Sequence, residues 1–227
     1  MTAVSMPRSV LPRAVLFDWD NTLVDTWPCL IAALNRTLVH MGQQPWTDAY
    51  ARVHIAKSLR DSFPEMFGER WEEARDFFYR SFAEIHLEQL VPLNGAKDVL
   101  DHLRALGLWV AVVSNKTGTF LRQEAEHLGW TPLFRHLVGA GDAAQDKPAL
   151  APVEMALAGS GIQPGPDVWF IGDNRIDMEC GHAAGCWPVL INPDPPGGDH
   201  FVPYTPGQVF RSCDEFLIFL RNLAVSK

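Results

Sequence analysis

The stretch Ala14-Val-Leu-Phe-Asp-Trp-Asp-Asn-Thr22 decides the fold. Its first four residues are apolar and the fifth is an aspartate, which is typical of a buried strand that ends abruptly in a polar loop. Two carboxylates, Asp18 and Asp20, follow the strand at once. A carboxylate in this position is often only the N-cap of a helix. The stretch therefore indicates chemistry only if other polar groups meet it.

Similar apolar runs recur along the chain, at residues 108–113, 168–171 and 187–191, with a weaker one at 136–139. Segments with helical spacing of apolar residues precede them, and Gly107 and Gly129 end two of these segments. Strands that alternate with helices predict crossover units and a parallel sheet. We therefore expect an α/β protein with a three-layer, Rossmann-like core. The chain closes with a predicted helix at 214–221, which Ser212 or Asp214 would cap.

One long segment interrupts this alternation. From about residue 26 to residue 91 the pattern is amphipathic and helical, without a convincing strand, and prolines 28, 45, 64 and 92 punctuate it. An all-helical insert in an α/β domain is best interpreted as a cap. We expect a core domain of residues 1–25 and 93–227, with a helical cap domain of residues 26–92. The Pro- and Gly-rich segment 192–207 is expected to be irregular and exposed.

The composition excludes several classes of protein. The chain has 227 residues, of which 47% are apolar, and a formal charge of −8. It lacks the basic stripe of a nucleic-acid-binding protein, and no apolar run approaches the ~18 residues of a membrane span. Four cysteines without a Cys-x-x-Cys pair favour free thiols in a reducing compartment. We expect a cytoplasmic protein, either a monomer or a homodimer, that binds neither nucleic acid nor membrane.

Four polar clusters come close after predicted strands. They are Asp18 with Asp20, Ser114 with Asn115, Lys147 before a proline, and Asp173 with Asp177. Open parallel sheets bind their ligands at the carboxyl ends of their strands. We therefore expect the four clusters to converge on one site.

Such a site would need cations. Asp18, Asp20, Asp173 and Asp177 would bring up to four negative charges together, and two unit charges 4 Å apart repel by about 4 kcal/mol at an effective dielectric of 20. A divalent ion and Lys147 would supply three positive charges. Mg²⁺ suits carboxylates, water and a substrate phosphate, whereas the scattered histidines form no pair suited to a softer metal. The expected cofactor is Mg²⁺.

Phosphoryl transfer is the chemistry that fits this set of residues. A carboxylate can attack phosphorus and divide one hydrolysis into two easier steps, while the metal and Lys147 stabilise the phosphoryl oxygens. A second carboxylate two residues on, such as Asp20, can protonate the leaving group and then deprotonate the attacking water. The Ser114 hydroxyl and the Asn115 N–H are suited to hold a phosphate oxygen. The expected partner is a small phosphate monoester.

These residues resemble the four motifs of the haloacid dehalogenase superfamily. Asp18-Trp-Asp-Asn-Thr22 matches its first motif, Val112-Val-Ser-Asn-Lys116 its second, Asp146-Lys-Pro148 its third and Gly172-Asp-Asn-Arg-Ile-Asp177 its fourth. All four occur in order, the helical insert is similar to the family's small C1-type cap, and the chain most resembles the phosphoglycolate-phosphatase group.

The resemblance implies a role for each matching residue. Asp18 would be the nucleophile and Asp20 the acid and base, while Ser114 and Lys147 would bind phosphate. Mg²⁺ would be held by Asp18, by the backbone carbonyl of Asp20 and by Asp173, with Asp177 as a further metal or neighbouring carboxylate. Two positions depart from the family pattern. Asn21 replaces the commonest glycine, although asparagine tolerates unusual φ, and Asn174 could alter contacts around the metal.

Other functions remain open on the same motifs. A phosphomutase would use the same residues but retain the phosphorylated product, and a non-catalytic binding module would keep only the fold. A dehalogenase of the superfamily lacks the second aspartate, which is present here as Asp20. A dinucleotide-dependent oxidoreductase is disfavoured, since Gly139-x-Gly141-x-x-Ala144 leads into a poor helix opening with two prolines. In the cap, Arg52, Lys57 and Arg60 fall in one expected helical stretch and would suit a second anion on the substrate, or simply form a solvated basic face.

Overall fold

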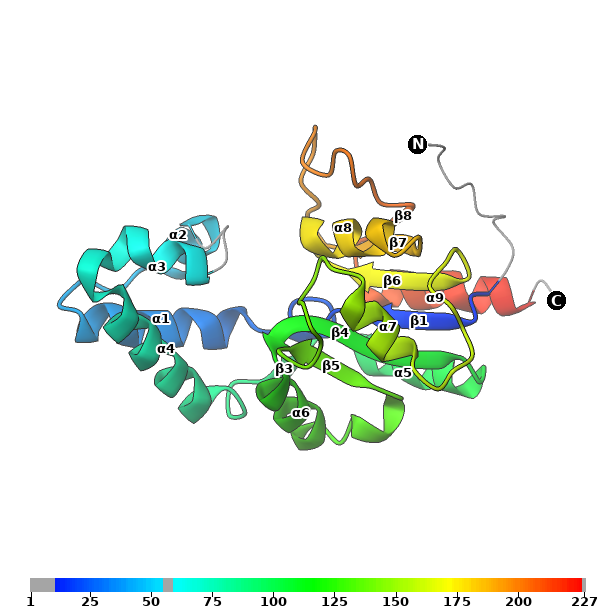
Figure 1. Cartoon of the computed structure of the whole chain (residues 1–227), viewed down its shortest axis with the longest axis horizontal. Coiled ribbons are helices and arrows are strands. Elements are labelled where there is room, and N and C mark those ends of the chain that lie inside the picture. The colour runs from blue at the N-terminus through cyan, green and yellow to red at the C-terminus, as the bar shows by residue number, and fades with distance from the viewer. Residues whose placement is uncertain (1–10, 55–58, 226–227) are drawn as a thin grey trace. The chain divides into compact units, whose positions relative to one another are not determined.

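The computed structural model describes residues 11–54 and 59–225. Its main sheet contains β1 (Ala14–Phe17), β4 (Trp109–Thr117), β5 (Leu137–Ala140), β6 (Val168–Gly172), β7 (Trp187–Ile191) and β8 (Gln208–Phe210). These six strands lie in the order β5-β4-β1-β6-β7-β8, and each pairs in parallel with its neighbours (Figure 1). The predicted α/β class with a parallel sheet is confirmed.

Helices cover both faces of this sheet. They are α5 (Ala96–Ala105), α6 (Gly118–His127), α7 (Ala151–Leu157), α8 (Arg175–Ala183) and α9 (Cys213–Val225), with a short 3-10 helix η2 (Thr131–Leu133). On one face Leu16 and Phe170 join a buried cluster with residues of α7 and α8. On the other face the Trp169 ring contacts Phe216 and Phe219 of α9. Because neighbouring strand residues point to opposite faces, the nearly continuous apolar runs of the sequence supply both interfaces, and the three layers are confirmed.

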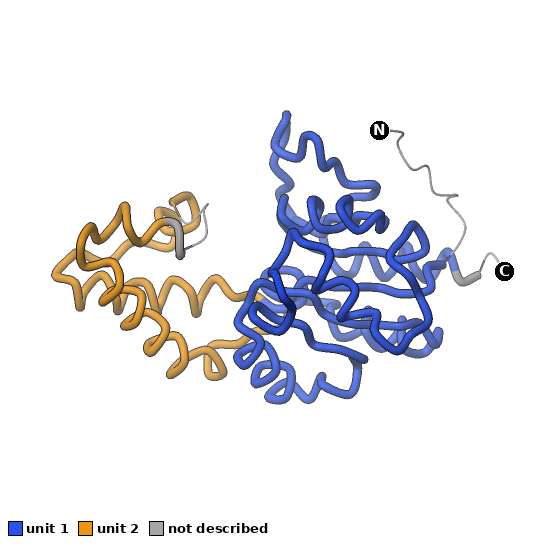
Figure 2. The backbone as a smooth tube through the Cα atoms, in the orientation of Figure 1, with its two compact units in different colours: residues 1–24, 92–227 blue, residues 25–91 orange. Residues whose placement is uncertain are grey.

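The described chain divides into two compact units at β2 (Val24–Asp25) and β3 (Val91–Pro92), which pair as a two-stranded ribbon (Figure 2). The boundaries expected from the sequence, after residues 25 and 92, lie one residue from these divisions. That residues 26–92 act as a cap domain stays a prediction.

The smaller unit is helical. It contains α1 (Trp27–His40), α2 (Asp48–His54), α3 (Leu59–Phe67), the 3-10 helix η1 (Gly68–Arg70) and α4 (Trp71–Ile85). Helices α1 and α3 both pack against α4, and the ring of Phe63 in α3 meets that of Phe78 in α4. Arg52 lies in α2 and Arg60 in α3, and residues 55–58 between these helices are outside the described part of the chain, so the expected basic helical stretch stays a prediction. Lys57 lies outside the described residues.

The C-terminal third departs from expectation in two places. The strand β8 was not expected, since three residues after a proline-rich segment carry too short a pattern. The segment 192–207 is irregular as predicted, but it is not wholly exposed, because Phe201 is buried against Met178 and Leu190. As expected, Ser212 precedes the last helix, and its hydroxyl accepts the backbone N–H of Glu215.

No helix among the described residues is both long enough and apolar enough to cross a membrane.

Candidate active site

Three neighbouring parallel strands run toward the same edge of the sheet. Phe17 in β1 is level with Val112 in β4 and with Ile171 in β6. Because the strands are parallel, β1 and β6 both end at this edge, where open α/β sheets place their ligands. The register therefore carries Asp18 and Asp173 to one place.

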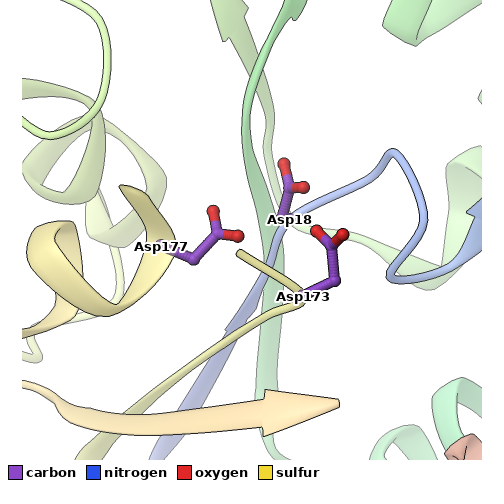
Figure 3. Close-up of side chains that lie close together, drawn as sticks. All are labelled: Asp18, Asp173 and Asp177. Carbon is purple, nitrogen blue, oxygen red and sulfur yellow. The ribbon is translucent and has the colours of Figure 1, made fainter. Parts of the chain in front are cut away.

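Asp18, Asp173 and Asp177 form a carboxylate cluster at this edge. Each offers one oxygen, and these oxygens lie within 4.8 Å of one another. Figure 3 shows the three carboxylates facing a common space, from the end of β1, the loop after β6 and the first turn of α8. Two of them, Asp18 and Asp177, are buried. The predicted convergence of these loops is thus observed.

Lys147 lies against the carboxylate cluster. Its Nζ atom is 2.7 Å from Oδ1 of Asp18 and 2.7 Å from Oδ1 of Asp177. The ammonium is buried, and a buried charge needs partners of opposite sign. Burial opposes the charged form of Lys147, but the nearby Asp177 and Asp18 outweigh it and raise the pKa of the ammonium. Lys147 is therefore a fixed cation beside Asp18.

Asn115 holds the backbone of Lys147 in place. Its side-chain oxygen accepts the N–H of Lys147 at 3.0 Å, and its amide nitrogen donates to the carbonyl of Lys147 at 3.1 Å. Ser114 is buried, and its Oγ accepts the backbone N–H of Lys116 at 3.2 Å. A hydroxyl that accepts one hydrogen bond still has its own proton to donate. Phosphate binding by Ser114 and by the Asn115 N–H stays a prediction.

Local contacts set the direction of Asp177. Its Oδ2 accepts the backbone N–H of Asn174 at 3.1 Å, as part of a capping box that opens α8. A Cβ atom on Gly172 would lie only 2.2 Å from the Cβ of Asp177. Only glycine lets the Asp177 side chain approach the end of β6 this closely. Asn174, which departs from the family pattern, is thus the N-cap of α8.

The loop around Asp173 is anchored from two sides. The Thr22 hydroxyl lies 3.5 Å from Oδ1 of Asp173, and the Asn192 side chain donates to the Asp173 carbonyl at 3.0 Å. Desolvation, followed by the charges of Asp177 and Asp18, raises the pKa of Asp173. Burial likewise raises the pKa of Asp18 to about 7, although Lys147 works in the opposite direction. Both carboxylates are therefore held where a cation would favour their charged form.

Asp20 lies outside the carboxylate cluster. Its side chain is 27% exposed, and its Oδ1 is 2.7 Å from Nζ of Lys116. The next residue, Asn21, has a φ of 57°. This left-handed conformation is the unusual φ that the asparagine was expected to tolerate, and the turn is formed. Asp20 and Asp18 thus have different lysine partners, Lys116 and Lys147.

The partners of Lys116 were not expected from the sequence. Lys116 also contacts Oε2 of Glu124 at 2.6 Å, and the indole N–H of Trp19 donates to the same oxygen at 2.6 Å. Glu124 lies three residues after Leu121 on α6, so an acidic residue falls on the apolar face of a helix. That position was a signal of a buried, paired charge.

The carboxylate cluster fits the expected cofactor. Oxygen ligands are those that Mg²⁺ prefers, and it takes one or two carboxylates together with water and phosphate. Asp18 and Asp173 offer such oxygens within 4.8 Å of each other. Their raised pKa values show that two negative charges are unfavourable here without a further cation, which a divalent ion would supply. Asp177 already receives the Lys147 ammonium and the Asn174 N–H. The carboxylate of Asp20 does not belong to the cluster.

Known proteins match the chain over most of its length. The haloacid dehalogenase-like hydrolase family matches residues 15–191. A phosphoglycolate phosphatase of Pseudomonas putida is 31% identical over 185 residues, which are 77% of this chain and 67% of that protein. Phosphoglycolate phosphatase 1 of Pseudomonas aeruginosa is 32% identical over 186 residues, with 77% and 67% covered. The family match includes Asp18, Lys147, Asp173 and Asp177.

Solved structures agree with this match. A haloacid dehalogenase superfamily hydrolase from Ehrlichia chaffeensis superposes with a TM-score of 0.64 at 29% identity, over 94% of this chain and 98% of that one. A haloacid dehalogenase-like hydrolase from Streptococcus pneumoniae gives a TM-score of 0.81 at 19% identity, over 92% and 98%. At the lower identity the likeness shows the fold alone.

Proposed function

The chain belongs to the haloacid dehalogenase-like hydrolase family, and we propose that it is a magnesium-dependent phosphatase in which Asp18 accepts the phosphoryl group. The superfamily expected from the sequence motifs is thereby confirmed. One observation carries the proposal further. Asp18 lies buried between a fixed ammonium, that of Lys147, and two more carboxylates whose oxygens lie within 4.8 Å of one another and of its own. The site thus brings together a candidate nucleophile, Asp18, a cation, Lys147, and carboxylate ligands for a metal.

The first step transfers the phosphoryl group to the protein. An Asp18 oxygen attacks phosphorus, the bond from phosphorus to the ester oxygen breaks, and its electron pair leaves with that oxygen. Asp20, in its protonated form, gives the leaving oxygen a proton. Lys147 offsets the negative charge of the transferring group, since its ammonium is already held beside the Asp18 carboxylate at 2.7 Å. The products are an aspartyl-phosphate and an alcohol.

The second step releases inorganic phosphate. Water attacks phosphorus, Asp20 accepts its proton, and the bond from phosphorus to the Asp18 oxygen breaks. Asp18 regains its carboxylate and Asp20 its proton, so both are ready for another turnover. When bound by Asp18 and Asp173, Mg²⁺ would supply the positive charge that lets an anionic nucleophile approach an anionic ester.

The substrate is proposed from the relatives. The two Pseudomonas proteins are phosphoglycolate phosphatases by name and are 31% and 32% identical to this chain. We therefore propose a small phosphate monoester that resembles phosphoglycolate, with its specificity set by residues 26–92. The cytoplasmic location and the choice between monomer and homodimer stay predictions.

A rate assay tests the proposal. Hydrolysis of p-nitrophenyl phosphate is measured with Mg²⁺, with excess chelator, and with the Asp18→Asn variant. We expect activity only for the unaltered chain with Mg²⁺, and equal rates in all three conditions would refute the phosphatase. Release of inorganic phosphate separates a phosphatase from a phosphomutase, which keeps the phosphoryl group on its product. No activity on any monoester would favour a non-catalytic module.

A panel of phosphorylated metabolites then ranks the substrates by kcat/KM. A sugar phosphate that is hydrolysed better than phosphoglycolate would overturn the substrate class but not the reaction.

A further inference from the structure

A second buried lysine lies beside the proposed acid and base. The Lys116 side chain is 5% exposed, and its Nζ is 2.7 Å from Oδ1 of Asp20 and 2.6 Å from Oε2 of Glu124. Burial opposes the ammonium, but the charges of Asp20 and Glu124 outweigh it and raise the pKa of Lys116. Lys116 is thus a cation shared between one carboxylate of the core and one at the site.

Glu124 is the buried partner of Lys116 and is held in place by the core. Its side chain is 1% exposed, and its Oε2 accepts both the Lys116 ammonium and the indole N–H of Trp19 at 2.6 Å. Trp19 is itself fully buried and packs edge-on against the rings of Trp130 and Phe134. Since these groups sit in the packed interior, the position of the Lys116 ammonium is set by the core and not by solvent.

Asp20 is the more exposed partner of Lys116. Its side chain is 27% exposed, and the residue that follows it, Asn21, has a φ of 57°. A short carboxylate at such a position needs a partner to hold one direction. A proton donor or acceptor contributes to catalysis only when it is aimed at the reacting atom. Each aspartate has its own lysine partner: Lys147 contacts Asp18, and Lys116 contacts Asp20.

We propose that Lys116 is a positioning residue which, anchored by Glu124 and Trp19, aims the Asp20 carboxylate for both proton transfers. The inference rests on the proposed phosphatase function. The competing explanation is that Lys116 only neutralises the buried charge of Glu124. The two explanations predict different behaviour once both charges are removed together.

The test compares four variants of the whole chain: Lys116→Met, Glu124→Gln, the double variant that combines them, and Arg122→Met. Arg122 lies on the same helix as Glu124 and forms an exposed ion pair with Asp142 at 2.7 Å, so its loss is a control for a change in ion pairing on α6. Each variant is measured for thermal unfolding and for kcat and KM with Mg²⁺.

Removing Lys116 alone leaves the Glu124 carboxylate buried without its ammonium partner, so the Lys116→Met variant is expected to lose stability. The double variant removes both charges and is expected to recover stability. Its kcat is nevertheless expected to stay on the order of 10- to 100-fold below that of the unaltered chain, with little change in KM, since Asp20 is no longer aimed. Glu124→Gln keeps an oxygen for Trp19 and should lower kcat less, and Arg122→Met should leave kcat unchanged.

Pre-steady-state kinetics distinguish a positioning role of Lys116 from a purely structural one, because a structural role would not slow one chemical step selectively. Nitrophenolate leaves without a proton, so formation of the aspartyl-phosphate from p-nitrophenyl phosphate should remain fast in the double variant. Its hydrolysis needs Asp20 and should be slow. We expect a burst of one nitrophenolate per chain followed by the lowered steady rate, and a larger fall in rate on an alkyl phosphate, whose leaving group needs the proton.

A kcat of the double variant or of Glu124→Gln equal to that of the unaltered chain would overturn the inference, as would a steady rate without a burst. Failure of the proposed function looks different. In that case the unaltered chain itself would show no Mg²⁺-dependent hydrolysis, or the Asp18→Asn variant would remain active.

Discussion

Asp18 and Asp20 are separated by one residue, yet each is paired with a different lysine. Asp18 is buried at the end of β1 beside Lys147, and its pKa is raised to about 7 by desolvation. Asp20 is partly exposed, just before the turn at Asn21, and contacts Lys116. Two carboxylates can have different chemical roles when their surroundings differ. In our proposal, Asp18 forms the bond to phosphorus and Asp20 moves the protons.

This division predicts the behaviour of the Asp20→Asn variant. Asparagine cannot transfer the proton, so kcat should fall by about 10²- to 10⁴-fold. The Asp20 carboxylate is not part of the carboxylate cluster, so the Kd for Mg²⁺ measured by calorimetry should change only a few-fold. A loss of Mg²⁺ affinity as large as the loss of turnover would show that the side chain is a metal ligand after all.

The site residues could be predicted from the sequence where each follows a strand. Asp18, Ser114 and Asp173 come directly after apolar runs, and parallel strands bring such positions to one edge. The partners of Asp20 could not be predicted in the same way. Glu124 reaches Lys116 only because α6 packs against β4 with one face inward, and that rotation is set by tertiary packing.

At the scale of elements, the close approach of α8 to β6 is possible because residue 172 is a glycine and has no side chain. The Cβ of any residue at position 172 would meet the Asp177 side chain at 2.2 Å, and that side chain is also held by Lys147. The first turn of α8 would have to move away from the sheet. The capping box at Asn174 would open with it, because it uses the other oxygen of Asp177.

The Gly172→Ala variant should therefore lose about 1–3 kcal/mol of stability to overpacking. It should also bind Mg²⁺ more weakly, since Asp177 and the neighbouring Asp173 are displaced. Gly165→Ala is the matched control, because a Cβ there would find its nearest atom at 3.9 Å, and its stability should change by less than about 0.5 kcal/mol. Chemical denaturation measures both variants. Equal stability of the two would contradict the close contact at position 172.

Sequence patterns predict the long strands of the sheet but not its short edge strand or the path of the proline-rich loop. The strands β1, β4, β6 and β7 carry long apolar runs, and their positions follow from the sequence. The edge strand β8 has three residues, of which only Phe210 is buried, so no periodicity marks it. Phe201 lies in a proline-rich loop and is buried against α8 and β7. Such a contact depends on the path of the loop, which local residue preferences do not determine.

For the whole molecule, the carboxylate cluster links stability to pH and to the metal. Without a cation, Asp18 has a pKa of about 7 in the folded chain against 3.8 as the ordinary value. Between about pH 4 and pH 7 the folded chain keeps a proton that the unfolded chain has released. The contribution of Asp18 to stability therefore falls as the pH rises through this window. A divalent cation competes with that proton.

Stabilisation by Mg²⁺ should accordingly grow with pH. At pH 5, only about one chain in a hundred would have Asp18 ionised, so Mg²⁺ should bind roughly a hundredfold more weakly than at pH 8. Thermal unfolding with and without Mg²⁺ should give a clear increase in Tm at pH 8 and little at pH 5. In the Asp18→Asn variant the dependence on pH should be smaller. An increase in Tm that is equal at both pH values would contradict the account.

Peptide mapping tests most directly whether Asp18 is the phosphoryl acceptor. The chain is quenched in acid during turnover of p-nitrophenyl phosphate with Mg²⁺, digested, and analysed by mass spectrometry. We predict one phosphoryl group on the peptide that contains Asp18, and none when chelator replaces Mg²⁺ or in the Asp18→Asn variant. A phosphoryl group on another residue, or hydrolysis by Asp18→Asn at the rate of the unaltered chain, would contradict it.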